Sequence, residues 1–177
     1  MKYEQNEIEP EIEIREATID DLAIIFHLGE RIFTSQESTN LYRTWDEYAV
    51  ISLFNSEPEF MLVAEIENRV IGFALGTLIE KNRSAWTYGH LLWLAVDQKY
   101  ARKGVASDLF DTFRKTVTNA GARMLMVDTQ ADNARAISFF QNKGFVNPID
   151  HVYMTLNLES KSGTKNDKNK DKSRNKK

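Results

Sequence analysis

The chain has no cysteine among its 177 residues. Without thiols it can form no disulfide bond, no thiolate metal site and no acyl-cysteine, which excludes acyl transfer through a cysteine nucleophile. Histidine is scarce as well, because the three histidines are scattered and show no HExxH-like spacing. The sequence therefore gives no support for a metal site.

Long hydrophobic runs are also missing. No segment approaches the roughly 18 apolar residues that a membrane span needs, and the acidic start, MKYEQNEIEPEIEI, lacks the apolar core of a signal peptide. We therefore expect a cytoplasmic protein without membrane contact. With 42% hydrophobic residues, a chain of this length can bury one sizeable core and has little room for a second domain.

Apolar residues are absent from the last part of the chain. Residues 159–177 carry a net charge of +5, while the whole chain has a formal charge of −3, so the preceding residues are acidic. We expect one domain over residues 1–158 and a disordered lysine-rich tail over 159–177. A solubilising tail is the favoured interpretation. The alternative, nucleic-acid binding, predicts a steep salt dependence that is lost on truncation at Glu159.

Hydrophobic periodicity predicts a mixed α/β chain without internal repeats. The strand Tyr88–Val96 is apolar on both faces, which is typical of a central strand. The expected elements, in chain order, are a strand around Ile12 and Ile14, a helix after the capping sequence Thr18–Asp21, a helix from the capping sequence Thr44–Glu47 to about Asn55, strands Phe60–Glu67, Val70–Glu80 and Tyr88–Val96, a helix with the buried stripe Val105, Leu109, Phe113 and Val117, a strand Arg123–Thr129, a helix Ala134–Asn142, and one or two strands within Phe145–Leu158.

The segment Leu91–Ser107 joins an apolar strand to a basic, glycine-containing turn that opens a helix. Backbone N–H groups at a helix start lack intrahelical partners, and the helix dipole adds roughly half a positive charge there. Gly104 and Ala106 let a phosphate approach the backbone, while Arg102 and Lys103 supply charge. A phosphorylated ligand is one interpretation of this turn, and an ordinary strand–turn–helix connection is the other.

The turn matches neither a P-loop nor a GxGxxG dinucleotide motif. Leu94-Ala95-Val96, four further residues and then Ala101-Arg102-Lys103-Gly104-Val105-Ala106 resemble motif A, [QR]xxGx[GA], of the GNAT superfamily of acyl-coenzyme A N-acyltransferases. Ala101 departs from this pattern, because glutamine or arginine is usual there. A second segment, NARAISFFQNKGF from Asn133 to Phe145, resembles motif B, NxxAxxFYxxxGF. By itself it would be a core helix that ends at Gly144.

This resemblance implies the GNAT fold, a mostly antiparallel sheet of about six to seven strands with about four helices. In that fold the sheet splays between its fourth and fifth strands, and the coenzyme lies in the opening. The implied reaction is direct attack of an amine on the thioester of acetyl-coenzyme A. The implied coenzyme contacts are the backbone of Leu94, Ala95 and Val96 where the fourth strand bulges, the pyrophosphate turn of Arg102, Lys103, Gly104, Val105, Ala106 and Ser107, the side chain of Asn133, and Phe139 and Phe140 at the thiol end.

An amine attacks only as the neutral form, so the reaction needs a base. Alternation along the strand places His90 on the face of Leu92, Leu94 and Val96, and the histone-acetylating members carry their glutamate base at this distance from motif A. A histidine suits the task, because imidazole ordinarily titrates near neutral pH. His90 is therefore a candidate base, with a hydrogen-bonded core histidine as the alternative.

The leaving thiolate could take a proton from a tyrosine, which many members carry seven residues after the motif B asparagine. Phe140 occupies that position here and cannot donate a proton. Tyr153 is a candidate substitute, although a strand aromatic is more often a core residue. If no acid is used, the reaction is slowed rather than abolished, because a thiolate is a tolerable leaving group.

The sequence favours an acetyl-coenzyme A-dependent amine N-acetyltransferase, and the main alternative is a non-catalytic acyl-coenzyme A-binding module. The acidic body suits a cationic acceptor such as a polyamine, a lysine side chain or a peptide N-terminus. In this family the acceptor pocket is lined by loops that correspond to Phe33–Thr44 and Asn147–Val152. The acceptor itself is not identified, and either a monomer or a homodimer is compatible with the sequence.

Overall fold

The computed structural model describes residues 11–34, 45–80, 86–150, 152 and 154. Its internal contacts divide the chain into a unit Met1–Val146 and a second unit Asn147–Lys177. The described residues of the second unit form no helix or strand. The predicted domain end at residue 158 and the tail over 159–177 remain predictions, because these residues lie outside the described part.

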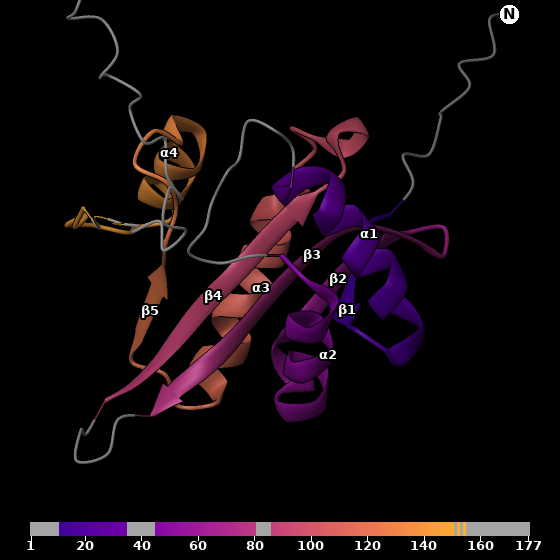
Figure 1. Cartoon of the computed structure of the whole chain (residues 1–177), viewed down its shortest axis with the longest axis horizontal. Coiled ribbons are helices and arrows are strands. Elements are labelled where there is room, and N and C mark those ends of the chain that lie inside the picture. The colour runs from indigo at the N-terminus through magenta and orange to yellow at the C-terminus, as the bar shows by residue number, and fades with distance from the viewer. Residues whose placement is uncertain (1–10, 35–44, 81–85, 151, 153, 155–177) are drawn as a thin grey trace, which may run out of the picture. The chain divides into compact units, whose positions relative to one another are not determined.

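The first unit contains a five-stranded sheet in the order β1-β2-β3-β4-β5 (Figure 1). Its strands are β1 (Glu13–Glu16), β2 (Met61–Ile66), β3 (Arg69–Glu80), β4 (Thr87–Val96) and β5 (Met124–Val127). Neighbouring strands are antiparallel except for β4 and β5, which run parallel. The predicted mixed α/β class with a mostly antiparallel sheet is confirmed.

The number of strands in the described residues is smaller than the six to seven that we expected. Residues 145–150, which were expected to begin the final strands, are irregular. Most of the remaining candidates, 151, 153 and 155–158, lie outside the described residues.

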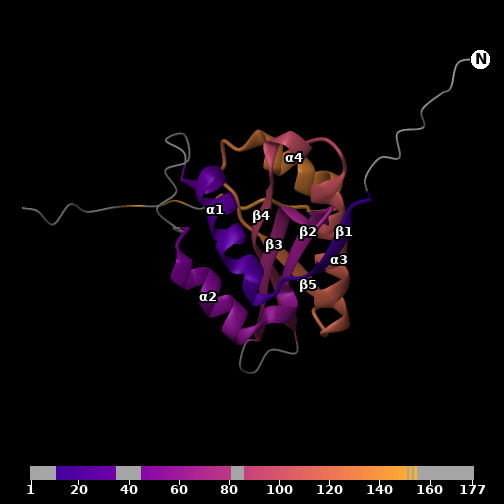
Figure 2. The same cartoon turned by 90° about the vertical axis from the view of Figure 1, so that its right-hand side faces the viewer.

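The four expected helices are present as α1 (Leu22–Phe33), α2 (Glu47–Ser56), α3 (Val105–Asn119) and α4 (Ala134–Asn142). Figure 2 shows α1 and α2 on one face of the sheet and α3 on the other. Three short 3-10 turns, Ile19–Asp21, Pro58–Phe60 and Gln98–Tyr100, precede or follow them. No helix in the described residues combines the length and the apolar character that crossing a membrane requires.

One apolar cluster lies on each face of the sheet, between the sheet and the helices that cover that face. The predicted stripe of α3 is confirmed, because Val105, Leu109, Phe113 and Val117 are all buried against the sheet. On the opposite face, Trp45 is the centre of an aromatic group that includes Phe73 and Trp93, whose ring centroids lie 5.5 and 5.2 Å from its own. These clusters fix the position of β4, the strand between them.

Side-chain caps begin the 3-10 turn that leads into α1 and the helix α2. The predicted capping at Thr18 is confirmed, since its N–H donates to Asp21 Oδ2 at 2.8 Å. The predicted start of α2 is wrong by two residues: the cap is Asp46, whose carboxylate accepts a hydrogen bond from Ala49 N–H at 2.8 Å. Aspartate satisfies an orphan N–H at a helix start at least as well as threonine, and Thr44 lies outside the described residues.

A partly buried ion-pair network joins the start of the fold to β2. Arg15 donates to both carboxylate oxygens of Asp21, at 2.7 and 3.0 Å, and also to Glu65. Asp21 is only 5% exposed. The hydrogen bond from Arg15 holds the pKa of Asp21 below its ordinary value, with further contributions from Thr18. The ionised network therefore anchors the turn before α1.

We expect Asp21→Asn to lower the free energy of unfolding at pH 7 by about 2 kcal/mol, because two charge-assisted hydrogen bonds weaken in a buried place. Since the folded pKa of Asp21 is depressed, its stabilisation is complete above the ordinary pKa and disappears as pH falls through the lower folded value. Denaturant titrations from pH 7 to 2 measure this. The difference between wild type and variant should shrink below about pH 4, and a constant difference contradicts the assignment.

Candidate active site

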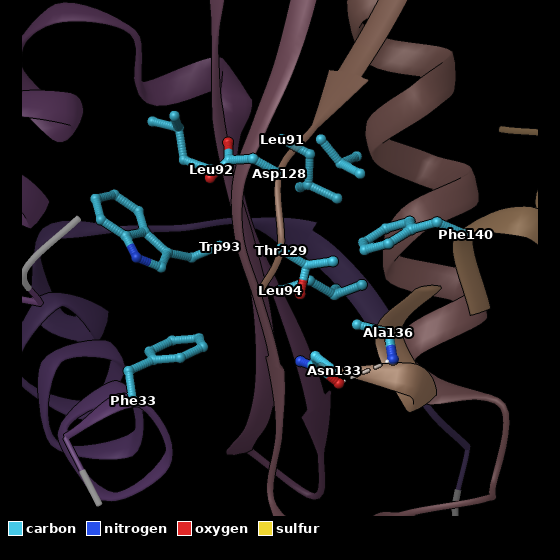
Figure 3. A pocket seen from close by; sticks show the side chains of 11 residues that line it. Phe33, Leu91, Leu92, Trp93, Leu94, Asp128, Thr129, Asn133, Ala136 and Phe140 are labelled. Atoms are coloured by element: carbon cyan, nitrogen blue, oxygen red, sulfur yellow. Dashed lines mark hydrogen bonds between the residues drawn. The ribbon is translucent and has the colours of Figure 1, made fainter. Parts of the chain in front are cut away.

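A cleft opens where β4 and β5 separate. The two strands pair from Tyr88 opposite Met124 to Leu91 opposite Val127, and β5 ends there. Beyond this point lies a cleft of about 130 Å³ (Figure 3). Its lining residues are Phe33, Leu91, Leu92, Trp93, Leu94, Val127, Asp128, Thr129, Asn133, Ala136 and Phe140. The splay expected from the sequence resemblance is therefore present.

β4 bulges beside this cleft, at Leu92. Leu75 of β3 pairs with Trp93 and the next residue, Gly76, pairs with Leu91, so Leu92 is an extra residue on β4. The bulge lies two residues before the expected Leu94, Ala95 and Val96, which pair regularly with Ala74, Phe73 and Gly72. Of these three, Leu94 lines the cleft.

The bulge reverses the side-chain alternation that we used to orient His90. Leu91 belongs to the apolar cluster on the α3 side of the sheet, and beyond the bulge Leu94 and Val96 also pack there. His90 alternates with Leu91, so it faces the side of the sheet that carries α1 and α2. The prediction that His90 shares a face with Leu94 and Val96 is therefore wrong.

His90 forms a pair with Asp128, which follows β5. The imidazole Nε2 lies 2.8 Å from Asp128 Oδ1, and the two side chains are 15% and 38% exposed. Asp128 lines the cleft, whereas His90 is not among the lining residues. Asp128 was not among the site residues predicted from the sequence. The available signal was a carboxylate at the end of a short apolar strand, five residues before Asn133.

The basic turn between β4 and α3 is exposed at Arg102, Lys103 and Gly104, whereas Val105 is buried. Arg102 and Gly104 have φ angles of +66° and +86°, and α3 begins at Val105. None of the five N–H groups from Arg102 to Ala106 donates a hydrogen bond within the described residues. The side chains of Arg102 and Lys103 are exposed. A row of available N–H groups at a helix start, with two cations, is suited to bind phosphate.

The helix of the second motif borders the cleft from the α3 side. Asn133 caps α4, because its side-chain oxygen accepts from Ala136 N–H at 3.1 Å, and Asn133 also lines the cleft (Figure 3). Phe140 lines the cleft as well. Phe139 does not, and its ring packs against Phe110 with centroids 6.0 Å apart. Gly144, with φ of +95°, ends the helix as predicted.

Lys143, which follows α4, links it to α3 by hydrogen bonds close to the basic turn. Its ammonium donates to Ser107 Oγ at 2.5 Å and to Asp111 Oδ2 at 2.6 Å. The hydrogen bond from Lys143 holds the pKa of Asp111 below its ordinary value. Ser107, expected at the pyrophosphate, therefore also takes part in the contact that holds the two motifs together.

The side of the cleft opposite α4 is aromatic. Phe33, the last residue of α1, and Trp93 line it. That the segment starting at Phe33 receives the acceptor stays a prediction. Residues 35–44 and Tyr153 lie outside the described part, so the roles predicted for them remain predictions. In the described residues, no group of three or more His, Asp or Glu side chains could hold a metal ion.

Comparison with known proteins identifies related chains. The model of the "Acetyltransferase (GNAT) family" matches residues 23–145. The chain is 28% identical over 106 residues to N-alpha-acetyltransferase 30 of Schizosaccharomyces pombe, covering 60% of this chain and 70% of the relative. It resembles the structure of Ard1 from Thermoplasma volcanium with a TM-score of 0.63 and 25% identity, over 78% and 84% of the two chains. A chain of the NatC complex bound to Gag peptide and CoA matches with a TM-score of 0.67 and 20% identity, over 78% and 87%.

Proposed function

Because this chain belongs to the GNAT acetyltransferase family, we propose that it transfers the acetyl group of acetyl-coenzyme A to a primary amine by direct attack. This proposal rests mainly on the N–H groups from Arg102 to Ala106, which follow β4, the strand that lines the cleft, after the short 3-10 turn Gln98–Tyr100. An elongated thioester with a pyrophosphate can place its phosphates at this turn and its acyl end along β4. The residues present therefore fit the coenzyme.

The coenzyme supplies an activated acetyl group, and the chain binds and orients it. Arg102, Lys103 and the backbone N–H groups of Gly104 to Ala106 hold the pyrophosphate, whereas the Ser107 N–H donates to the Gly104 carbonyl. On the α4 side, Asn133 binds the arm with its amide nitrogen, because its oxygen already caps the helix. Phe140 shields the thiol end from water. Phe139 instead packs against Phe110 and so holds α4 against α3.

A peptide N-terminus is the acceptor that we propose. The relative in Schizosaccharomyces pombe is named an N-alpha-acetyltransferase, and a structural neighbour was solved with a peptide. The described cleft is small, and its lining residues are mostly apolar with one carboxylate, Asp128. Such a site suits a single ammonium group on an extended chain better than a polycation, which needs several carboxylates.

The acceptor loses one proton before it attacks, and His90, which lies behind Asp128, takes this proton through a water molecule. The acceptor nitrogen then forms a bond to the carbonyl carbon as the carbon–sulfur bond breaks. A second proton leaves the nitrogen and ends on the departing sulfur, so the products are an amide, the free thiol and one proton on His90. Asp128 stabilises the imidazolium that forms, because their hydrogen bond becomes an ion pair.

A screen of amines with acetyl-coenzyme A, read by free thiol release, tests this function. We expect thiol release that depends on the amine, with the strongest response among short peptides with free N-termini. N-terminally blocked versions of the same peptides are the matched controls and should give only background hydrolysis. Coenzyme binding without acceptor-dependent thiol release contradicts the proposal and favours the non-catalytic acyl-coenzyme A-binding module.

A further inference from the structure

Asp128 is the only charged side chain among the eleven described residues that line the cleft. On the α1 side, it lies in a wall formed by Phe33, Leu92 and Trp93 (Figure 3). A carboxylate among apolar groups interacts more strongly with a cation than the same group in open water, because water screens the pair less. Such a residue distinguishes charged from neutral ligands.

A hydrogen bond with His90 holds this carboxylate at the cleft. Its Nε2 lies 2.8 Å from Asp128 Oδ1, and the imidazole is 15% exposed, while Asp128 is 38% exposed. The pair therefore has an inner member, His90, and an outer member, Asp128, that reaches the cleft. A carboxylate has about four lone-pair sites, and the hydrogen bond with His90 occupies one of them.

The strand register supports this division of roles. Leu125 and Val127 pack on the α3 side, so alternation places Met126 and Asp128 on the opposite face, together with His90, the register partner of Met126. The thiol end of the coenzyme is assigned to the α4 side of the cleft, where Asn133 and Phe140 lie. Asp128 faces the other side, from which the acceptor approaches.

We propose that Asp128 binds the ammonium group of the acceptor and selects cationic primary amines over neutral molecules of the same shape. In this arrangement the aromatic wall of Phe33 and Trp93 receives the carbon atoms next to the ammonium. His90, which does not line the cleft, holds the carboxylate in position through their hydrogen bond. The inference rests on the proposed function only in naming the bound cation as the acetyl acceptor.

Two ligands of equal shape test the proposal without acetyl transfer. 2-Phenylethylamine is a cation at pH 7, and 2-phenylethanol is its neutral counterpart. Binding of each to the coenzyme A-bound protein is followed through the indole signal of Trp93 in the NMR spectrum of protein labelled on tryptophan, with a Trp93→Phe variant for assignment. We expect the cation to bind at least about tenfold more tightly, which is typical of a charge-assisted hydrogen bond.

Asp128→Asn keeps the size of the side chain and an oxygen that accepts from His90, but removes the charge. The preference for the cation should disappear in this variant, and the affinity for coenzyme A should not change. Asp132→Asn is the matched control, because Asp132 is an exposed carboxylate that does not line the cleft. This variant should retain the preference.

Equal affinity of wild type for the two ligands, no shift of the Trp93 signal with either ligand, or a preference that survives Asp128→Asn each overturns the proposal. Thiol release separates this outcome from failure of the proposed function. A chain that prefers the cation but acetylates no amine contradicts the acetyl transfer alone. A chain that acetylates amines without this preference contradicts the Asp128 site alone.

Discussion

Replacing His90 by glutamine should lower turnover about 10²–10⁴-fold, the usual contribution of a general base. Glutamine keeps a polar side chain of similar size that can still donate to Asp128, but it cannot take up a proton near neutral pH. The Kd of acetyl-coenzyme A should stay the same, because the coenzyme contacts that we propose lie on the α3 and α4 side. Steady-state kinetics and calorimetry measure the two effects separately.

The pH profile distinguishes a base from a structural role for His90. Turnover of the wild type should fall on the acidic side, where the base is protonated, and His90→Gln should lose this dependence. His27→Gln is the matched control, since His27 is an exposed residue of α1 that should leave turnover and pH profile unchanged. Equal turnover of wild type and His90→Gln would assign His90 to a supporting role behind Asp128.

Replacing Gly104 by glutamate should abolish binding of acetyl-coenzyme A. The backbone φ of +86° at this position is unfavourable for any residue with a Cβ, and the new carboxylate would repel the pyrophosphate beside the N–H row. A Cβ at Gly104 has space, with Asp108 Oδ2 at 3.7 Å as its nearest neighbour, so the variant should fold. Calorimetric titration with the coenzyme gives the affinity.

Gly121 provides a control with the same backbone strain. It follows α3, has a φ of +92°, and a Cβ there meets nothing within 4 Å. Gly121→Glu should therefore lower the free energy of unfolding by about as much as Gly104→Glu, roughly 1 kcal/mol, and leave coenzyme affinity intact. If Gly104→Glu is folded and binds the coenzyme normally, the phosphate-turn assignment is wrong.

Patterns confined to one segment predicted much of the structure. The apolar stripe of α3, the capping at Thr18 and the end of α4 at Gly144 depend on residues a few positions apart, and all three are confirmed. The order of strands and helices followed from hydrophobic periodicity, and the splay of the sheet was expected only from the family resemblance that the two motifs carry. The helix features are visible in the sequence because local geometry determines them.

Features that depend on pairing between strands could not be predicted. The bulge at Leu92 is set by its register with β3, and nothing in the run LLWLAV marks it. One extra residue reverses every later side chain, so the face of His90 was predicted wrongly. Asp128 was missed for the same reason, because its importance arises from contact with a residue 38 positions away.

The central claim is tested most directly by following a labelled acetyl group. The protein is incubated with acetyl-coenzyme A labelled in its acetyl group and with short peptides that have free N-termini, and the coenzyme, peptides and protein are then separated. We predict label on the N-terminal nitrogen of the peptide, none covalently bound to the protein, and much less transfer by His90→Gln. Label that remains on the coenzyme with every amine, although the coenzyme binds, would contradict acetyl transfer, and label on the protein that later moves to the peptide would contradict direct attack.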